Sequence, residues 1–129
     1  MTAQVLEFLG GNPGRTALFE AVERVISELG DCELSVAKTQ ISWGNPFKFA
    51  FLSNPPRSLV RQGRAEECLL LSFGLDHREV HPRIAAAANP YPDRWTHHVV
   101  LAEPGDIDET VKNWLECGYI FAKLKKRRR

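Results

Sequence analysis

A cluster of polar and titratable side chains stands at the start of an apolar run between Arg94 and Leu101, where the sequence is Arg-Trp-Thr-His-His-Val-Val-Leu. The segment combines a guanidinium, an indole, a hydroxyl and two imidazoles. Side chains at the entrance of a strand are held by rigid backbone and still reach solvent, which suits a binding or catalytic site. The same residues also fit the hydrogen-bonded edge of a core, and no motif in the segment fixes a reaction.

The two adjacent histidines are predicted to have different roles, because neighbouring side chains of a strand point to opposite faces. His97 shares its face with Trp95 and Val99, so it is predicted to be a hydrogen-bonded core residue. His98 lies on the other face and is the candidate for proton transfer or for contact with an anion. If the protein is a small hydrolase or transferase, which is a further alternative, His98 is the expected general base. The sequence names no partner nucleophile, since it has no Gly-x-Ser-x-Gly elbow.

A metal site is the alternative use of the remaining histidines, His77 and His81, which stand four residues apart beside Asp76 and Glu79. On a helix this spacing would place both imidazoles on one face, as in a zinc site. The segment falls instead in a turn between predicted strands and lacks the His-Glu-x-x-His order, so no metal site is predicted. The three cysteines form no Cys-x-x-Cys pair and are expected to be reduced thiols. No cofactor is expected.

The chain of 129 residues is long enough for one domain with a continuous core, and its 43% hydrophobic and 26% charged residues are typical of a globular protein. We assign residues 1–122 to a single domain and residues 123–129 to a basic C-terminal tail that we expect to be disordered. Six of the 17 basic residues lie in this tail, which leaves 11 against 16 acidic ones in the rest. No apolar run could span a bilayer and no signal sequence is evident, so we expect a cytoplasmic protein without a membrane partner.

Two segments show helical periodicity. The first is predicted to begin after Asn12 as its cap, with Pro13 in the first helical position, and to end at Gly30. The second is predicted to open at Asp106 as its cap, with Glu109 three residues later completing a capping box. A short amphipathic turn over residues 5–9 is expected before them.

Between these helices the apolar period becomes two, which indicates strands. Phe47, Phe49 and Phe51 are predicted to point into the core from one strand, with Lys48 and Ala50 on its other side. Further strands are predicted over residues 69–75, 84–89 and 99–101. Within residues 34–43 the apolar phase slips, which indicates a bulge or a bend between two short strands.

This order of elements, with no crossover helix between the strands, predicts an α+β two-layer sandwich. We expect a mainly antiparallel sheet of about five strands, with an N-terminal and a C-terminal helix packed on one face.

The alternation places small and polar side chains on the face of the sheet that the helices leave open. Small residues there would leave space for a ligand, and polar residues would fix its orientation through hydrogen bonds, as a ligand cleft requires. We therefore predict a non-enzymatic binding module for a small anionic or nucleotide-like ligand, although an ordinary solvated sheet face has the same pattern. Trp43 or Trp95 would stack on the ligand if either ring is exposed. The predicted ligand-binding residues are Lys38, Gln40, Ser42, Lys48, Arg94, Thr96 and His98.

A second hypothesis is association with nucleic acid, because basic residues gather in the long connection 54–67 and in the tail. Such residues can neutralise phosphates, whereas the acidic remainder of the chain weakens this interpretation. A solvated loop and tail have the same composition. An exposed edge strand could also support a homodimer. The residues that would contact nucleic acid are Arg57, Arg61, Arg64, Lys125, Lys126 and Arg127.

The stretches Lys-Thr-Gln-Ile (38–41) and Arg-Trp-Thr-His-His (94–98), followed by the predicted helix over 107–119, also give the chain a family likeness. Over about residues 5–122 it resembles the uncharacterised bacterial family called domain of unknown function 5655. The resemblance implies a compact single domain, found alone or fused to other domains, with no established activity. It supports the fold and the location of the site and adds no chemistry, and the basic tail lies outside it.

Overall fold

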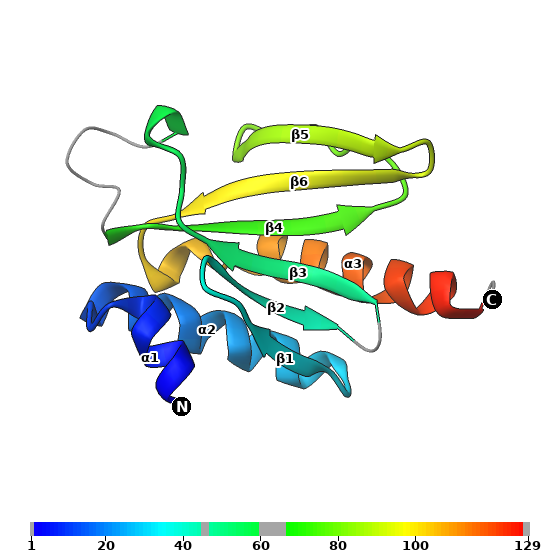
Figure 1. Cartoon of the computed structure of the whole chain (residues 1–129). Helices are drawn as coiled ribbons and strands as arrows, with labels where there is room; N and C mark the ends of the chain where they lie inside the picture. The colour runs from blue at the N-terminus through cyan, green and yellow to red at the C-terminus, as the bar shows by residue number, and fades with distance from the viewer. Residues whose placement is uncertain (1, 45–46, 60–66, 128–129) are drawn as a thin grey trace.

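The computed structural model describes residues 2–44, 47–59 and 67–127, and for residues 125–127 it describes the backbone alone. Three α-helices and six strands follow one another along these residues, with two short 3-10 helices in the connections (Figure 1). The elements are α1 (Ala3–Leu9), α2 (Pro13–Leu29), β1 (Glu33–Val36), β2 (Gln40–Gly44), β3 (Lys48–Ser53), η1 (Arg57–Leu59), β4 (Leu69–Leu75), β5 (Ile84–Tyr91), β6 (Arg94–Leu101), η3 (Pro104–Asp106) and α3 (Glu109–Arg127).

The strands form one sheet in the order β1-β2-β3-β4-β6-β5, and every neighbouring pair is antiparallel. The predicted α+β class is therefore confirmed, with six strands in place of about five. The extra strand comes from the phase slip in residues 34–43, where a turn at residues 37–39 separates β1 from β2. The bend between two short strands is thus the correct alternative.

Helices α2 and α3 cover the same face of the sheet. Phe19 of α2 stacks on Trp43 of β2 with 6.0 Å between the ring centroids, and Trp114 of α3 stacks on Phe73 of β4 at 5.4 Å. Trp43 and Phe73 both lie opposite Ala50 in the register, so they point to the same side. In the view of Figure 1 both helices lie behind the sheet. The predicted arrangement of helices on one face is confirmed.

The start of α2 follows from local chemistry. The Oδ1 atom of Asn12 accepts a hydrogen bond of 3.0 Å from the backbone N–H of Arg15, and Pro13 has no N–H that would need a partner there. The helix ends at Leu29, immediately before Gly30, whose φ of 150° favours glycine. The predicted boundaries of this helix are confirmed.

The start of α3 differs from the prediction. Asp106 belongs to η3, where its Oδ2 atom accepts hydrogen bonds from the N–H groups of Ala102 and Glu103. The first turn of α3 is capped instead by Asp108, whose Oδ1 atom accepts from the N–H of Val111 at 3.1 Å. This bond holds the pKa of the Asp108 carboxyl below its ordinary value. Asp106 and Asp108 are both residue types that cap helices, and the 3-10 turn uses Asp106 while α3 uses Asp108.

The predicted phase of the phenylalanine strand is wrong. Ala50 and Leu52 are fully buried on the helix side, whereas the half-buried Phe51 points to the opposite face. Phe49 still lies on the helix side, because its ring meets that of Tyr119 of α3 edge to face at 5.4 Å. The cause is an irregularity in the ladder, where the register between β2 and β3 shifts after Trp43.

The C-terminal segment continues the last helix. α3 extends to Arg127, so five of the seven residues assigned to the tail are helical. Basic residues in a last turn interact favourably with the negative end of the helix dipole, which explains why the helix persists there. Among the described helices, none combines the length and the apolar composition that crossing a membrane requires.

Candidate functional site

The face of the sheet opposite α2 and α3, here called the open face, is formed by alternate residues of the central strands. Cross-strand pairing places Ser42, Phe51, Ser72, His98 and Ala86 in one row across β2, β3, β4, β6 and β5. Ser42 is 2% exposed and Ser72 is 6% exposed, although neither faces a helix. Phe51 stands between these serines in the row, so a bulky ring alternates with small polar side chains there. The open face is therefore uneven at its centre.

Ser72 and His98 form the central polar contact of this face. The Oγ atom of Ser72 lies 2.7 Å from Nδ1 of His98, across the β4–β6 pair. Burial lowers the pKa of His98, so its ring is neutral at pH 7. With the proton on Nε2, the serine hydroxyl donates to Nδ1, and the imidazole acts as the acceptor.

Arg94 lies over a gap that Gly74 leaves in the open face. A Cβ atom at Gly74 would stand 3.1 Å from a guanidinium nitrogen of Arg94, so the absence of a side chain makes room for this group. The pairing of β3 with β4 ends at Ala50 and Phe73, and beyond that point a small hollow of about 10 Å³ opens between the strands and reaches Phe121 and Ala122 of α3. Lys48 also lines this hollow.

The two cations at this hollow have no carboxylate partner in the described part of the chain. Neither Lys48 nor Arg94 forms a salt bridge there, and the other residues lining the hollow are uncharged. They are Phe47, Phe49, Gly74, Phe121 and Ala122. Unpaired cations beside aromatic rings are suited to a phosphate or carboxylate group. The hollow is too small to enclose a ligand, so an anion would lie on the surface above it.

The structure divides the seven predicted ligand-binding residues into separate groups. Arg94 and Lys48 line one hollow, and Ser42, Thr96 and His98 lie on the open face beside or near it. Gln40 lies in the row of paired residues that contains Leu70 of β4. Leu70 is four residues from Gly74 along that strand. Lys38, in the β1–β2 turn, lines a different hollow against α1.

The predicted difference between the two neighbouring histidines is confirmed in their placement. His97 is fully buried, stacks on Phe73 at 5.2 Å, and accepts a hydrogen bond of 2.8 Å at Nε2 from the N–H of Glu79. Burial lowers the pKa of His97. The neutral ring thus fastens the β4–β5 connection to the core. Trp43 is only 3% exposed, so it offers no open-face stacking surface, whereas Phe51 is an aromatic residue that faces this side.

The other two histidines do not converge. The ring of His77 lies 2.7 Å from Asp76 and 3.2 Å from Glu79, and its hydrogen bond with Asp76 raises its pKa. His81 packs edge to face on Trp114 at 5.1 Å. Within residues 2–44, 47–59 and 67–127, no group of three or more His, Cys, Asp or Glu side chains is arranged to hold a metal ion.

The model of the family described as Domain of unknown function (DUF5655) matches residues 8–122. The chain belongs to this family. No curated protein and no solved structure matches the chain. The family match covers every strand of this DUF5655 domain and α3 as far as Ala122, so the whole open face lies inside it.

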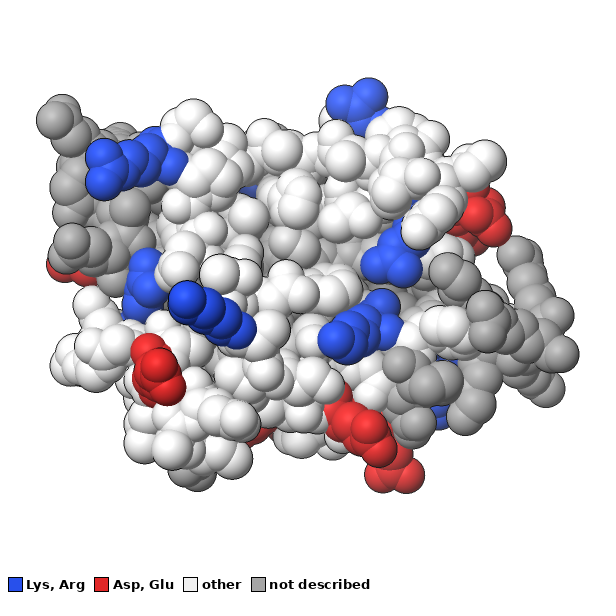
Figure 2. Space-filling model, in the orientation of Figure 1, with Lys and Arg blue, Asp and Glu red and all other residues white. Residues whose placement is uncertain are grey.

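Of the basic residues predicted to contact nucleic acid, only Arg57 has a described side chain, in η1. Arg61 and Arg64 lie outside the described residues, and Lys125, Lys126 and Arg127 are described as helix backbone. On the face seen in Figure 2, the described Lys and Arg side chains are scattered among uncharged surface and do not form a continuous stripe. A stripe of that kind is the usual footprint of a nucleic-acid-binding face.

Proposed function

We propose that this DUF5655 domain is a binding module that holds a small phosphate- or carboxylate-bearing ligand on its open face. The single observation that supports this proposal is that Arg94 and Lys48, two cations without a salt bridge to any described residue, line one hollow beside Gly74. Arg94 supplies hydrogen-bond donors in a fixed plane and Lys48 supplies a mobile charge. Thr96, paired with Gly74, adds a hydroxyl.

Phe51 makes a nucleotide a suitable ligand within this class. Phe51 pairs with Ser72 of β4, and Ser72 is two residues from Gly74. At the rise of a strand this corresponds to a separation of roughly 7 Å. A base stacked on Phe51 would leave its phosphate near Arg94. A surface site of this kind is expected to bind weakly, with Kd on the order of 1 mM.

The test is a titration of ¹⁵N-labelled protein with inorganic phosphate, AMP and adenosine. Phosphate and AMP should shift the amides of Gly74, Arg94 and Thr96, and adenosine should not. Arg94→Gln should weaken AMP binding about tenfold, since a charge-assisted contact is lost. Lys38→Gln, at the other end of the sheet, is the matched control and should bind like the wild type. Unchanged spectra with all three compounds at concentrations on the order of 10 mM would contradict the proposal.

The Ser72–His98 contact favours acyl transfer as a second candidate function. The hydroxyl of Ser72 lies 2.7 Å from Nδ1 of His98, and in the tautomer with the proton on Nε2 it donates to the imidazole, which is the geometry of an activated nucleophile. Ser72 lies in the middle of a strand that is paired on both sides, so its N–H belongs to the ladder and cannot serve an oxyanion hole. Because this N–H group is not free to stabilise an oxyanion, we rank acyl transfer below ligand binding. Hydrolysis of p-nitrophenyl acetate that disappears in Ser72→Ala would support it, and equal rates in both proteins would exclude it.

A further inference from the structure

β1 ends the sheet and presents an unpaired edge. It pairs with β2 on one side, and no described strand lies on the other. The N–H of Ala37 donates to the carbonyl of Gln40 at 2.8 Å, which fixes the alternation of the ladder. Glu33 and Ser35 therefore pair toward β2, whereas the N–H and C=O groups of Leu34 and Val36 point away from the sheet. These are the groups that an added strand would use.

Two hollows lie along this edge on the helix side. The first, between α2 and β1, has a volume of about 600 Å³ and includes Leu34 in its lining. The second, between α1 and the end of β1, has a volume of about 430 Å³ and includes Val36. Leu34 and Val36 are two residues apart. In a strand paired beside β1, side chains on one face are also two residues apart, so they would match this spacing. One side chain of an added strand would thus reach each hollow.

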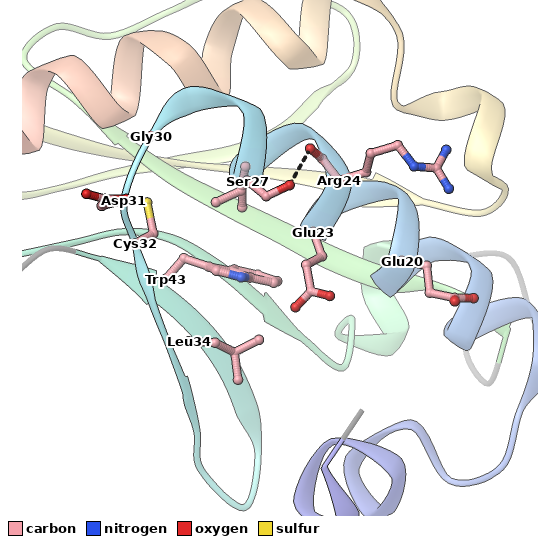
Figure 3. A pocket seen from close by; sticks show the side chains of 10 residues that line it. Glu20, Glu23, Arg24, Ser27, Gly30, Asp31, Cys32, Leu34 and Trp43 are labelled. Carbon is pink, nitrogen blue, oxygen red and sulfur yellow. Dashed lines mark hydrogen bonds between the residues drawn. The ribbon is translucent and has the colours of Figure 1, made fainter.

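Both hollows have apolar walls and acidic residues. Trp43 and Leu34 line the first, and Figure 3 shows Glu23 reaching from α2 toward them while Arg24 extends away along the helix. Phe8 lines the second together with Glu7. The charged residues of the two hollows are Glu7, Glu20, Glu23, Asp31, Arg24 and Lys38, an excess of two negative charges. In the described part of the chain, Glu7, Glu20 and Glu23 form no salt bridge.

We propose that the edge of β1 binds an extended basic segment of a partner protein, which adds to the sheet as a further strand. Lys or Arg at every second position of that segment would lie in the two hollows. Their aliphatic stems would pack on Leu34 and Val36, and their charged ends would reach Glu23 and Glu7. Backbone pairing supplies affinity, and the acidic residues select a basic sequence.

Two observations favour this occupant over the alternatives. The basic C-terminal segment of this chain is helical as far as Arg127, so a second copy does not offer it as an extended strand. The opposite edge of the sheet, β5, contains no charged residue between Ile84 and Tyr91 and provides no counter-charge for a basic segment.

The experiment measures fluorescence anisotropy with a labelled peptide Ser-Lys-Ser-Arg-Ser-Lys-Ser and the full chain. The peptide should bind, whereas the same peptide with Glu in place of every basic residue should not. A peptide of equal composition with its basic residues at every third position, Lys-Ser-Ser-Arg-Ser-Ser-Lys, should bind more weakly, because no two of its basic residues are two positions apart and so no two can reach the neighbouring hollows together.

Two variants test the edge itself. Val36→Pro removes an outward N–H without touching the β1–β2 ladder, so it should fold and lose about tenfold in affinity. Glu23→Lys should weaken binding through charge repulsion even if the proline variant does not fold. Glu116→Lys, an exposed site on α3, is the matched control and should have no effect.

Equal binding of the basic and acidic peptides would overturn the proposal, as would wild-type affinity in both Val36→Pro and Glu23→Lys. So would self-association of the protein that Val36→Pro abolishes, since the edge would then belong to a second copy. Arg94→Gln should leave peptide binding unchanged, which separates this test from that of the anion site.

Discussion

The hydroxyl of Ser72 lies 2.7 Å from the Nδ1 atom of His98, across the β4–β6 pair, although the two residues are 26 positions apart in the chain. This contact joins the segment 94–101 to the centre of the open face. It gives His98 a half-buried, hydrogen-bonded environment, and its neighbour His97 faces the core. The two imidazoles therefore differ in surroundings, and both are held neutral by burial.

The first prediction concerns the titration of the histidines. His97 and His98 should titrate below 6.5, the ordinary pKa, because burial disfavours the charged ring. His77 should titrate above it, since Asp76 hydrogen-bonds to its ring. NMR spectra of the ring nitrogens recorded across pH would assign each value. A pKa for His98 above that of His77 would contradict this environment.

The second prediction is that the protein loses stability as pH falls below about 6.5. In that range the unfolded chain takes up protons that the folded His97 and His98 do not, so unfolding becomes easier. The contribution of these two histidines to stability is fully present above pH 6.5. It is lost as pH falls through their pKa values in the folded protein, which lie below 6.5. His77 acts in the opposite direction, but it is exposed and screened.

Urea denaturation at pH 7.5 and at pH 5.5 measures this loss. His97→Gln keeps an oxygen that can accept from the N–H of Glu79 and cannot take a proton, so its stability should change less between the two pH values. His77→Gln is the control and should keep the wild-type difference. A His97→Gln profile as steep as the wild type would assign the loss to other groups.

The third prediction tests the gap at Gly74. An added methyl group in Gly74→Ala would meet the guanidinium of Arg94, which is the far end of a flexible side chain and can move. Stability should therefore fall by less than about 1 kcal/mol, while Arg94 is displaced from the hollow. Binding of AMP should weaken as in Arg94→Gln. Unchanged binding would show that the position of Arg94 over Gly74 has no part in the site.

The fold was predictable from sequence where local signals act, as at Asn12 and Pro13, whose chemistry specifies the start of α2. Alternation also assigned His97 and His98 to opposite faces. It failed at Ala50 and Phe51, because a register shift opposite Gly44 breaks the period of two, and such a shift depends on pairing between strands.

The site was predictable only in part for the same reason. Alternation indicates which face a residue occupies but not its neighbours across the sheet. Lys38 and Arg94 were grouped by face, and the strand order places them at different hollows. The contact between Ser72 and His98 follows from the β4–β6 register, which alternation within one strand does not specify.

The fourth prediction concerns Gly30, the residue between α2 and β1. Its φ of 150° is strained for other residues, and a Cβ atom there would collide with the hydroxyl end of Tyr119. Tyr119 is buried and packs on Phe49, so it cannot turn away without disturbing the core. Gly30→Ala should therefore lower the free energy of unfolding by about 2 kcal/mol. Gly105→Ala, where the nearest atom is 3.6 Å from the added group, is the control and should change it by less than about 0.5 kcal/mol. Equal stability of the two variants in urea would show that Tyr119 does not restrict this position.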